Sequence, residues 1–338
     1  MNYEEFKKEW LEENNFIKVK TSGSTGKPKE IRLSKDFMRD SAKRTNGFFD
    51  IKKGDILYSC ISPEFIGGKM MLVRAMLAKA ELISEEPSNR PLENFKRINF
   101  LDPGKEDFNC INNNHLFLED HYSDKKIKLL SVVPSQLLFI IENKYSLPKI
   151  ENILVGGGKI EKGLKEKILR SGLNVYESYG MTETASHIAL RYVSNNEEWF
   201  KTLGNITVCT DNRGCLVVNI PGEQSIVTND LGEVKDEKTF NLIGRIDTII
   251  NSGGRKINPE LIEERIAEII ESPFIITSVP DEKWGEKLIL KIEVANRGID
   301  TKEILNKIRE KVRPFEVPKD IKIVEKLERT DNGKIKRK

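Results

Sequence analysis

The chain is poor in the residues that build metal centres and covalent frameworks. Its 338 residues include only four cysteines and three histidines. The cysteines, at positions 60, 110, 209 and 215, lack the close spacing of a zinc site, so a structural metal is not expected. Scattered thiols are typical of a protein kept in a reducing compartment, and we therefore expect a cytoplasmic location.

Long apolar runs and a strong charge of either sign are also lacking. No run reaches the roughly 18 apolar residues of a membrane-spanning helix, and the acidic N-terminus has no apolar signal stretch. The 56 basic residues nearly cancel the 53 acidic ones, which leaves a net charge of +3. Nucleic acid is therefore not an expected partner. Hydrophobic residues still make up 38% of the chain, enough for a sizeable core.

Apolar segments typical of strands alternate with helical patterns through the first 180 residues. We expect helices at 1–14, 36–49, 68–79, 134–143 and 161–171, a hairpin at 16–34, and strands at 55–61, 81–84, 128–133, 152–155 and 174–178. The repeated strand–helix–strand order predicts an α/β fold with mostly parallel sheets. In the second helix, Phe37, Met38, Ala42 and Phe48 are the candidate core residues.

The pattern changes after residue 200. Short strands at 206–208, 215–220 and 225–228 predict a small β subdomain. From residue 246 onward, a hairpin around Gly253-Gly254, a helix at 259–271 and further strands and a helix predict a small α+β region. We therefore place a large N-terminal domain at 1–246 and a small C-terminal domain at 247–338.

The most informative loop is Thr21-Ser22-Gly23-Ser24-Thr25-Gly26-Lys27-Pro28-Lys29. Glycine backbone, hydroxyl groups and two lysines can surround a phosphate group. A Walker A loop is excluded, because Thr21 stands where the first glycine belongs and Pro28 follows Lys27. The alternating flanks predict a hairpin. Taken alone, the loop is as compatible with a flexible polar turn as with a phosphate site.

Five further segments follow in order, at 153–159, 177–184, 227–233, 244–257 and 329–335. They read ILVGGGK, ESYGMTET, VTNDLGE, GRIDTIINSGGRKI and RTDNGKI. Each is weak or moderate evidence by itself. Together, from about residue 20 to the C-terminus, they resemble the adenylate-forming superfamily of acyl-CoA synthetases, luciferases and peptide-synthetase adenylation domains.

The resemblance implies an enzyme in which a carboxylate attacks the α-phosphate of ATP, pyrophosphate leaves, and the thiol of CoA opens the acyl-adenylate. Tyr179 would offer its ring to adenine beside Gly157 and Gly158, while Asp230 would accept the ribose hydroxyls. Arg245 would contact ribose or phosphate. The ATP-binding residues it implies are Thr21, Ser22, Gly23, Ser24, Thr25, Gly26, Lys27, Lys29, Gly157, Gly158, Tyr179, Asp230 and Arg245.

The same resemblance implies the catalytic groups. Thr182 would donate to the α-phosphate, and Glu183 would bind Mg²⁺, since this hard cation prefers carboxylate oxygen. Lys334 would reach the reacting carboxylate from the C-terminal domain and stabilise developing charge. Asp247 stands at the hinge about which that domain rotates after adenylation. The proline that the family usually carries upstream of Lys334 is missing, and a merely solvated lysine is the alternative.

Residues 63–75 and 182–190 narrow the resemblance to the short o-succinylbenzoate–CoA ligases of menaquinone biosynthesis. Only twenty residues precede Thr21, whereas long family members carry over a hundred, so we expect a shortened N-terminal domain that a homodimer could cover. No histidine follows Pro63-Glu64-Phe65, so the aromatic gate of longer relatives is not assigned. Ser186 and His187, with Lys69 behind them, are the candidates for binding the acid's second carboxylate.

Four alternatives remain open at this point. The chain could be a carboxylate–CoA ligase for another aryl or fatty acid, a stand-alone adenylation enzyme, a peptide-synthetase adenylation module, or a nucleotide-binding protein that has lost catalysis. The last is disfavoured, because Thr182, Glu183, Asp230, Arg245 and Lys334 are all present.

Overall fold

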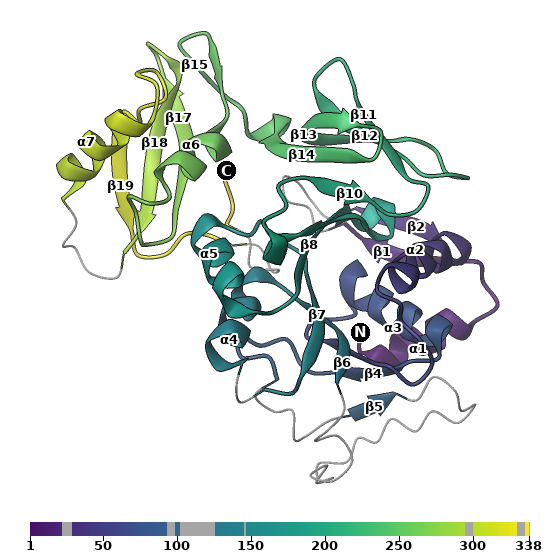
Figure 1. Cartoon of the computed structure of the whole chain (residues 1–338). Helices are drawn as coiled ribbons and strands as arrows, with labels where there is room; N and C mark the ends of the chain where they lie inside the picture. Colours follow the sequence, from purple (N-terminus) through teal and green to yellow (C-terminus); the bar gives the residue numbers. More distant parts are fainter. Residues whose placement is uncertain are drawn as a thin grey trace. The chain divides into compact units, whose positions relative to one another are not determined.

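The computed structural model describes residues 1–21, 29–92, 99–101, 126–144, 147–294, 300–329 and 335–337 (Figure 1). Contacts divide them into two compact units. The first comprises residues up to 207 together with 220–226, and the second comprises 208–219 together with the chain from 227 onward. The predicted domain boundary at 246/247 falls within the second unit. The hinge expected at this boundary remains a prediction.

The first unit is built on one mixed sheet with the strand order β10-β9-β8-β7-β6-β3-β4-β5. Its parallel strands are β3 (Ile56–Ser59), β4 (Glu81–Ser84), β6 (Ile127–Val132), β7 (Ile150–Val155) and β8 (Val175–Met181). Strands β5 (Asn99–Leu101), β9 (Ser186–Tyr192) and β10 (Phe200–Thr202) pair with their neighbours antiparallel. The predicted α/β class is confirmed; the returning strands β9 and β10 were not predicted.

Helices cover both faces of this sheet. Figure 1 shows α1 (Tyr3–Leu11), α2 (Lys35–Phe48) and α3 (Ile66–Ala78) on one side, and α4 (Pro134–Asn143) and α5 (Lys162–Ser171) on the other. All four residues of β3 are buried, as expected for a parallel strand between two helical layers. No helix in the described ranges combines the length and the apolar character needed to cross a bilayer.

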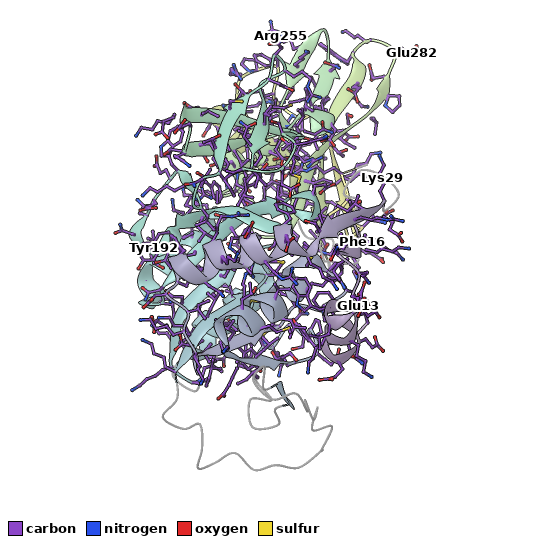
Figure 2. All side chains as sticks on the ribbon, turned by 90° about the vertical axis from the view of Figure 1, so that its right-hand side faces the viewer. Glu13, Phe16, Lys29, Tyr192, Arg255 and Glu282 are labelled. Atoms are coloured by element: carbon purple, nitrogen blue, oxygen red, sulfur yellow. The ribbon has the colours of Figure 1, made fainter. Side chains whose placement is uncertain are left out.

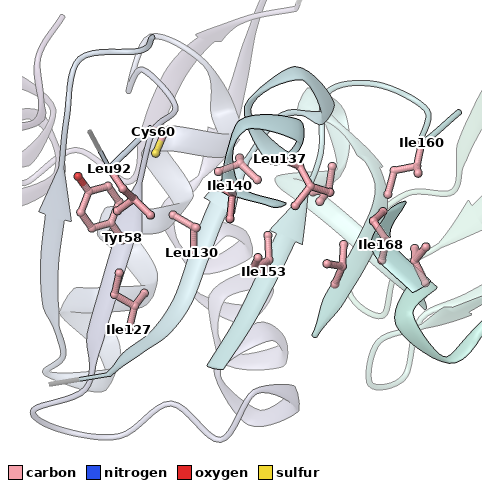
Figure 3. Close-up of a cluster of buried hydrophobic side chains, with 14 of the residues drawn as sticks. Tyr58, Cys60, Leu92, Ile127, Leu130, Leu137, Ile140, Ile153, Ile160 and Ile168 are labelled. Atoms are coloured by element: carbon pink, nitrogen blue, oxygen red, sulfur yellow. The ribbon is translucent and has the colours of Figure 1, made fainter. Parts of the chain in front are cut away.

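An apolar cluster joins α4 and α5 to the middle of the sheet (Figure 3). Leu137 and Ile140 of α4 and Ile168 of α5 pack against Leu130 and Ile153 of the strands. Each such side chain contributes about 1.5–3 kcal/mol when it is fully removed from water. The cluster therefore fixes strands β6 and β7. The carboxyl end of β6 leads into the first turn of α4, and that of β7 leads into the glycine run.

Helix α2 corrects one prediction about the core. Phe37, Met38 and Ala42 are buried as expected, but Phe48 is 48% exposed, so its assignment to the core was wrong. The ring of Phe48 instead packs edge-on against Phe49 and Tyr176, with centroid separations of 4.8 and 5.6 Å. An aromatic ring near a helix end can satisfy its packing with other aromatic rings at the surface.

The predicted N-terminal hairpin is confirmed. Strands β1 (Phe16–Lys20) and β2 (Glu30–Ser34) pair antiparallel, with Lys20 opposite Glu30. Beyond the last pair, the amide of Thr21 donates to the carbonyl of Lys29 at 2.9 Å, and the amide of Lys29 donates to the Thr21 hydroxyl at 3.0 Å. Lys29 and Phe16 lie at opposite ends of the hairpin (Figure 2).

The second unit contains two groups of paired strands. The first has the order β11-β12-β13-β14, formed by β11 (Thr207–Thr210), β12 (Cys215–Asn219), β13 (Ile226–Asp236) and β14 (Thr239–Arg245). The second contains β15 (Ile250–Ser252), β16 (Arg255–Ile257), β17 (Phe274–Asp281), β18 (Gly285–Glu293) and β19 (Asp320–Val324), with helices α6 (Pro259–Ile266) and α7 (Thr301–Lys311). Helix α6 ends at Ile266, short of the predicted residue 271, because the amide of Ile269 closes a turn on the Ile266 carbonyl.

Candidate functional site

The glycine run and the Tyr179–Glu183 segment meet at the carboxyl ends of two neighbouring parallel strands, β7 and β8. The Ser178 hydroxyl donates to the carbonyl of Val155 at 2.9 Å, which joins the ends of these strands. Gly157 adopts a φ of +78°, a left-handed conformation that favours glycine. A Cβ on Gly158 would touch Pro134 at 3.4 Å. Ligands of α/β sheets bind at this kind of edge.

Gly180 allows strand β9 to return close beside β8. A Cβ at this position would lie 2.2 Å from the carbonyl oxygen of Ser186 and 2.5 Å from the Cα of His187. The turn between the strands is a 3₁₀ segment, η2 (Thr182–Thr184), followed by Ala185 and Ser186 with φ values of +51° and +81°. Two non-glycine residues with positive φ in succession indicate backbone strain that the surroundings must hold.

The buried Thr184 holds this turn. Its hydroxyl accepts from the amide of Met181 at 2.9 Å and lies 3.0 and 2.6 Å from the carbonyl oxygens of Met181 and Ser186. No role was predicted for Thr184 from the sequence. Its effect is to fix the backbone on both sides of Thr182 and Glu183.

We expect Gly180→Ala to destabilise the protein by about 1–3 kcal/mol and to lower any activity that uses this turn, because a new methyl group would force β8 and β9 apart. Urea unfolding monitored by fluorescence measures the stability change. Gly163→Ala is the matched control: no atom lies within 4 Å of its added Cβ. Because Gly163 lies in the first turn of helix α5, alanine there should leave stability unchanged or raise it by at most about 0.5–1 kcal/mol. Equal effects of the two substitutions would contradict this role of Gly180.

Three predicted nucleotide-site residues follow one another around the end of β8. The Tyr179 ring is mostly buried and tilts against Phe200, with 6.1 Å between centroids. The Thr182 side chain is buried, whereas Glu183 is exposed at the start of η2. The described residues hold no cluster of three or more His, Cys, Asp or Glu side chains able to bind a metal. One exposed carboxylate still fits Mg²⁺, which is commonly held by one or two carboxylates together with substrate phosphates.

The structure brings Asp230, Arg245 and Asp247 together within the second unit. Asp230 and Arg245 face each other in the β13–β14 register, with Nη1 to Oδ1 at 2.9 Å. Arg245 also binds both carboxylate oxygens of Asp247, at 3.0 Å from Nε and 2.9 Å from Nη2. The hydrogen bond with Asp247 raises the pKa of Arg245. The predicted ribose-binding carboxylate and the predicted hinge residue thus share one guanidinium group.

His187 is fully enclosed between two polar partners. Its Nε2 lies 2.9 Å from the Thr45 hydroxyl, and its Nδ1 lies 3.3 Å from Nη2 of Arg74. The same Nη2 lies 3.4 Å from the Ser186 hydroxyl. Lys69, the third candidate for binding a carboxylate, faces α1: its Nζ lies 4.3 Å from the centroid of the Phe6 ring and 2.7 Å from Sδ of Met1. The carboxylate-binding roles of Ser186, His187 and Lys69 remain predictions.

Arg74 is a candidate that the sequence analysis missed. It is 1% exposed in α3, its Nε has no hydrogen-bond partner in the described part of the chain, and no carboxylate there forms an ion pair with it. Burial lowers the pKa of Arg74 to about 9. The available signal was a single arginine inside an otherwise apolar helical run, Met70-Met71-Leu72-Val73-Arg74-Ala75.

The neutral state of His187 predicts how the stability of the protein changes in acid. Burial, with the nearby cations Arg74 and Arg44, lowers the pKa of His187 well below 6.5. Below pH 6.5 the His187 ring takes up a proton in the unfolded chain but stays neutral in the folded protein. The free energy of unfolding therefore falls as the pH falls, by at most about 1.4 kcal/mol per pH unit. We expect His187→Gln to show a shallower loss between pH 6.5 and 5 in urea unfolding. Parallel profiles for both proteins would contradict this expectation.

Ser22–Lys27 and Lys334 lie outside the described residues, so their roles stay predictions. The chain on both sides of residues 330–334 is attached to the second unit. Arg329 and Ile335 form an antiparallel bridge. Two nitrogens of Arg337 bind the two oxygens of Glu263, at 2.7 and 2.6 Å.

The chain forms parallel strands that carry a glycine run and a Tyr-Gly-Met-Thr-Glu turn at their carboxyl ends. An Asp–Arg–Asp cluster and a C-terminal α+β region follow. Together these features define an adenylate-forming protein. The AMP-binding enzyme C-terminal domain family matches residues 267–334. An acyl-CoA synthetase (AMP-forming)/AMP-acid ligase II-like protein from Dyadobacter fermentans is 32% identical, with a TM-score of 0.59 over 98% of this chain and 90% of that one. The chain belongs to this family of AMP-forming acyl-CoA synthetases and AMP-acid ligases.

Other relatives carry a narrower name. The 2-succinylbenzoate–CoA ligase of Listeria monocytogenes is 30% identical over 66% of this chain and 54% of its own length. That of Bacillus cytotoxicus is 24% identical over 95% of this chain and 68% of its own. The chain thus spans about half the length of the first of these curated relatives. The o-succinylbenzoate coenzyme A synthetase of Bacillus subtilis, in complex with ATP and magnesium ion, shares the fold with a TM-score of 0.76, 19% identity and coverage of 95% and 68%.

Proposed function

We propose that the protein is an acid–thiol ligase that activates o-succinylbenzoate with ATP through an acyl-adenylate and transfers the acyl group to CoA, releasing AMP and pyrophosphate. Curated relatives in Listeria and Bacillus carry the name of this activity. The ordered segments from Thr21 to Ile335 support the adenylating chemistry, because the nucleotide motifs at 153–159 and 177–184 meet at the end of adjacent parallel strands.

Each candidate residue has a place in the proposed reaction. Thr182 and the Ser22–Lys29 loop would bind phosphate oxygens, and Glu183 would hold Mg²⁺ against them; a bound Mg²⁺ supplies charge neutralisation for the departing pyrophosphate. Asp230 would accept the ribose hydroxyls beside its ion pair with Arg245, in which Oδ1 lies 2.9 Å from Nη1. Lys334 would stabilise the charge that grows on the α-phosphate. Asp247 would act as the hinge.

One observation supports a dicarboxylic acid as the substrate: the enclosed guanidinium of Arg74. Burying a charge without an opposite charge costs several kcal/mol. An anionic group of a ligand, bound beside Ser186 at the end of the β8 turn, would offset that cost. One carboxylate of o-succinylbenzoate would be adenylated while the other pairs with Arg74, whose planar fork suits a carboxylate.

ATP–pyrophosphate exchange across a panel of acids tests the proposed substrate. We expect exchange with o-succinylbenzoate to exceed exchange with benzoate or a fatty acid by at least about 10²-fold in kcat/KM, because the monocarboxylates leave Arg74 unpaired. Exchange with benzoate or a fatty acid but none with o-succinylbenzoate would replace the proposal with a ligase for another acid. Full exchange without thioester formation in the presence of CoA would indicate a stand-alone adenylation enzyme.

We further propose a cytoplasmic location, supported by the unpaired state of the three cysteines that the structure describes, Cys60, Cys209 and Cys215. A homodimer is likewise a proposal. Sedimentation of the purified chain would test it, and a monomer at micromolar concentration would reject it.

A further inference from the structure

A chain of buried polar groups connects helix α2 to Arg74. The Thr45 hydroxyl lies 3.3 Å from the carbonyl oxygen of Ser41, one helical turn earlier, and 2.9 Å from Nε2 of His187. On the other side of the ring, Nδ1 lies 3.3 Å from Nη2 of Arg74. The Ser41 hydroxyl donates to the carbonyl of Ala185 at 2.8 Å, which ties the same helix to the β8–β9 turn.

The chemistry of the end groups fixes every proton in this chain. A guanidinium nitrogen can only donate, so Nδ1 of His187 must accept from Arg74. The ring proton then sits on Nε2 and donates to the Thr45 hydroxyl, whose own proton goes to the Ser41 carbonyl. A second protonation of the ring would place a third cation beside Arg74 of α3 and Arg44 of α2. Burial first, and then these two cations, lower the pKa of His187.

His187 is a neutral partner, so it orients the guanidinium of Arg74 without cancelling its positive charge. Nη2 is held by His187 and Ser186, and Nη1 lies 3.5 Å from Sδ of Met71, while Nε has no partner in the described part of the chain. A carboxylate in place of the imidazole would fix the fork equally well but would cancel its charge. The imidazole leaves that charge available to an anion from outside the protein.

We propose that Thr45 and His187 are positioning residues that hold the guanidinium of Arg74 in place for the second carboxylate of the acid substrate. The proposal rests on the proposed function and deepens it: the specificity for a dicarboxylic acid depends on a hydroxyl of α2 that does not contact the substrate. A network that only stabilised the fold would support binding of all acids and of ATP equally.

Steady-state exchange kinetics of Thr45→Val and Thr45→Ser distinguish these roles. Valine keeps the shape but removes the acceptor for Nε2, whereas serine restores it. We expect Thr45→Val to raise KM for o-succinylbenzoate about tenfold, the equivalent of one hydrogen bond, with KM for ATP unchanged and with Thr45→Ser near the wild type. Ser171→Ala, which removes another buried hydroxyl at the end of α5, is the control and should leave KM for the acid unchanged.

Two results would overturn the proposal. One is an unchanged KM for o-succinylbenzoate in Thr45→Val; the other is an equal rise of KM for the acid and for ATP. The underlying function is tested separately by the wild type, because absence of exchange with o-succinylbenzoate in the unmodified protein rejects both the function and the positioning role.

The ring tautomer gives a readout that is independent of activity. Long-range ¹H–¹⁵N correlation spectra distinguish a protonated from an unprotonated ring nitrogen, and the chain has only three histidines, so His187→Gln assigns the signal. We expect the proton on Nε2 in the wild type and in Thr45→Ser, and a mixture of tautomers in Thr45→Val. A proton on Nδ1 of the wild type would contradict the donor–acceptor order on which the proposal depends.

Discussion

Replacing Lys334 by alanine is expected to lower the rate of acyl-adenylate formation by at least about 10²-fold, the loss typical of removing one preorganised donor from a transition state that accumulates charge. The thiolysis of a supplied acyl-adenylate should remain within a few fold of the wild type. The two half-reactions are measured separately, by ATP–pyrophosphate exchange and by CoA thioester formation from synthetic adenylate.

The control for Lys334 is its neighbour Lys336. Nζ of Lys336 lies 4.0 Å from Oε2 of Glu328, and the Lys336 side chain is half-exposed. Replacing Lys336 by alanine should leave both half-reactions unchanged. Equal loss of both half-reactions in Lys334→Ala would refute a role confined to adenylation. Loss in both lysine variants would show that the tail as a whole, including the Arg337–Glu263 pair that attaches it, matters more than one ammonium group.

The parallel α/β class and the position of the nucleotide motifs at the ends of strands followed from the sequence for a physical reason. Apolar strands of four to seven residues alternated with helical periods, and parallel pairing brings the carboxyl ends of such strands to one edge. The glycine run after Val155 and the turn after Tyr179 therefore had to lie close together once β7 and β8 were neighbours. Asp230 and Arg245 met because one hairpin pairs them directly.

Contacts between side chains that are distant in sequence could not be predicted in this way. Arg74 and His187 are 113 positions apart, and nothing in either local pattern indicates that α3 and β9 place them side by side. Lys69 and Arg74 gave the same signal, one cation in an apolar helix. The structure separates them: Lys69 lies over the ring of Phe6, whereas Arg74 points to the β8–β9 turn.

Arg74→Met is expected to change stability and activity in opposite directions. Methionine fills a similar volume without a buried charge, and replacing buried ionic groups by well-packed apolar side chains is often neutral or stabilises a protein by about 1–4 kcal/mol. The same change removes the partner of the second carboxylate, so kcat/KM for o-succinylbenzoate should fall by at least about 10²-fold, while kcat/KM for benzoate stays constant or rises. Urea unfolding and ATP–pyrophosphate exchange with the two acids measure these effects.

Arg74→Lys separates charge from geometry. Lysine retains a cation but has no planar fork and cannot bind His187, Ser186 and a carboxylate at the same time, so we expect it to recover only part of the activity with o-succinylbenzoate. If Arg74→Met instead lowered both stability and activity towards every acid, Arg74 would be a structural residue of the α3–β9 contact. A more stable protein that has lost activity only towards the dicarboxylic acid would identify Arg74 as a buried charge that lowers stability but is required for binding the substrate.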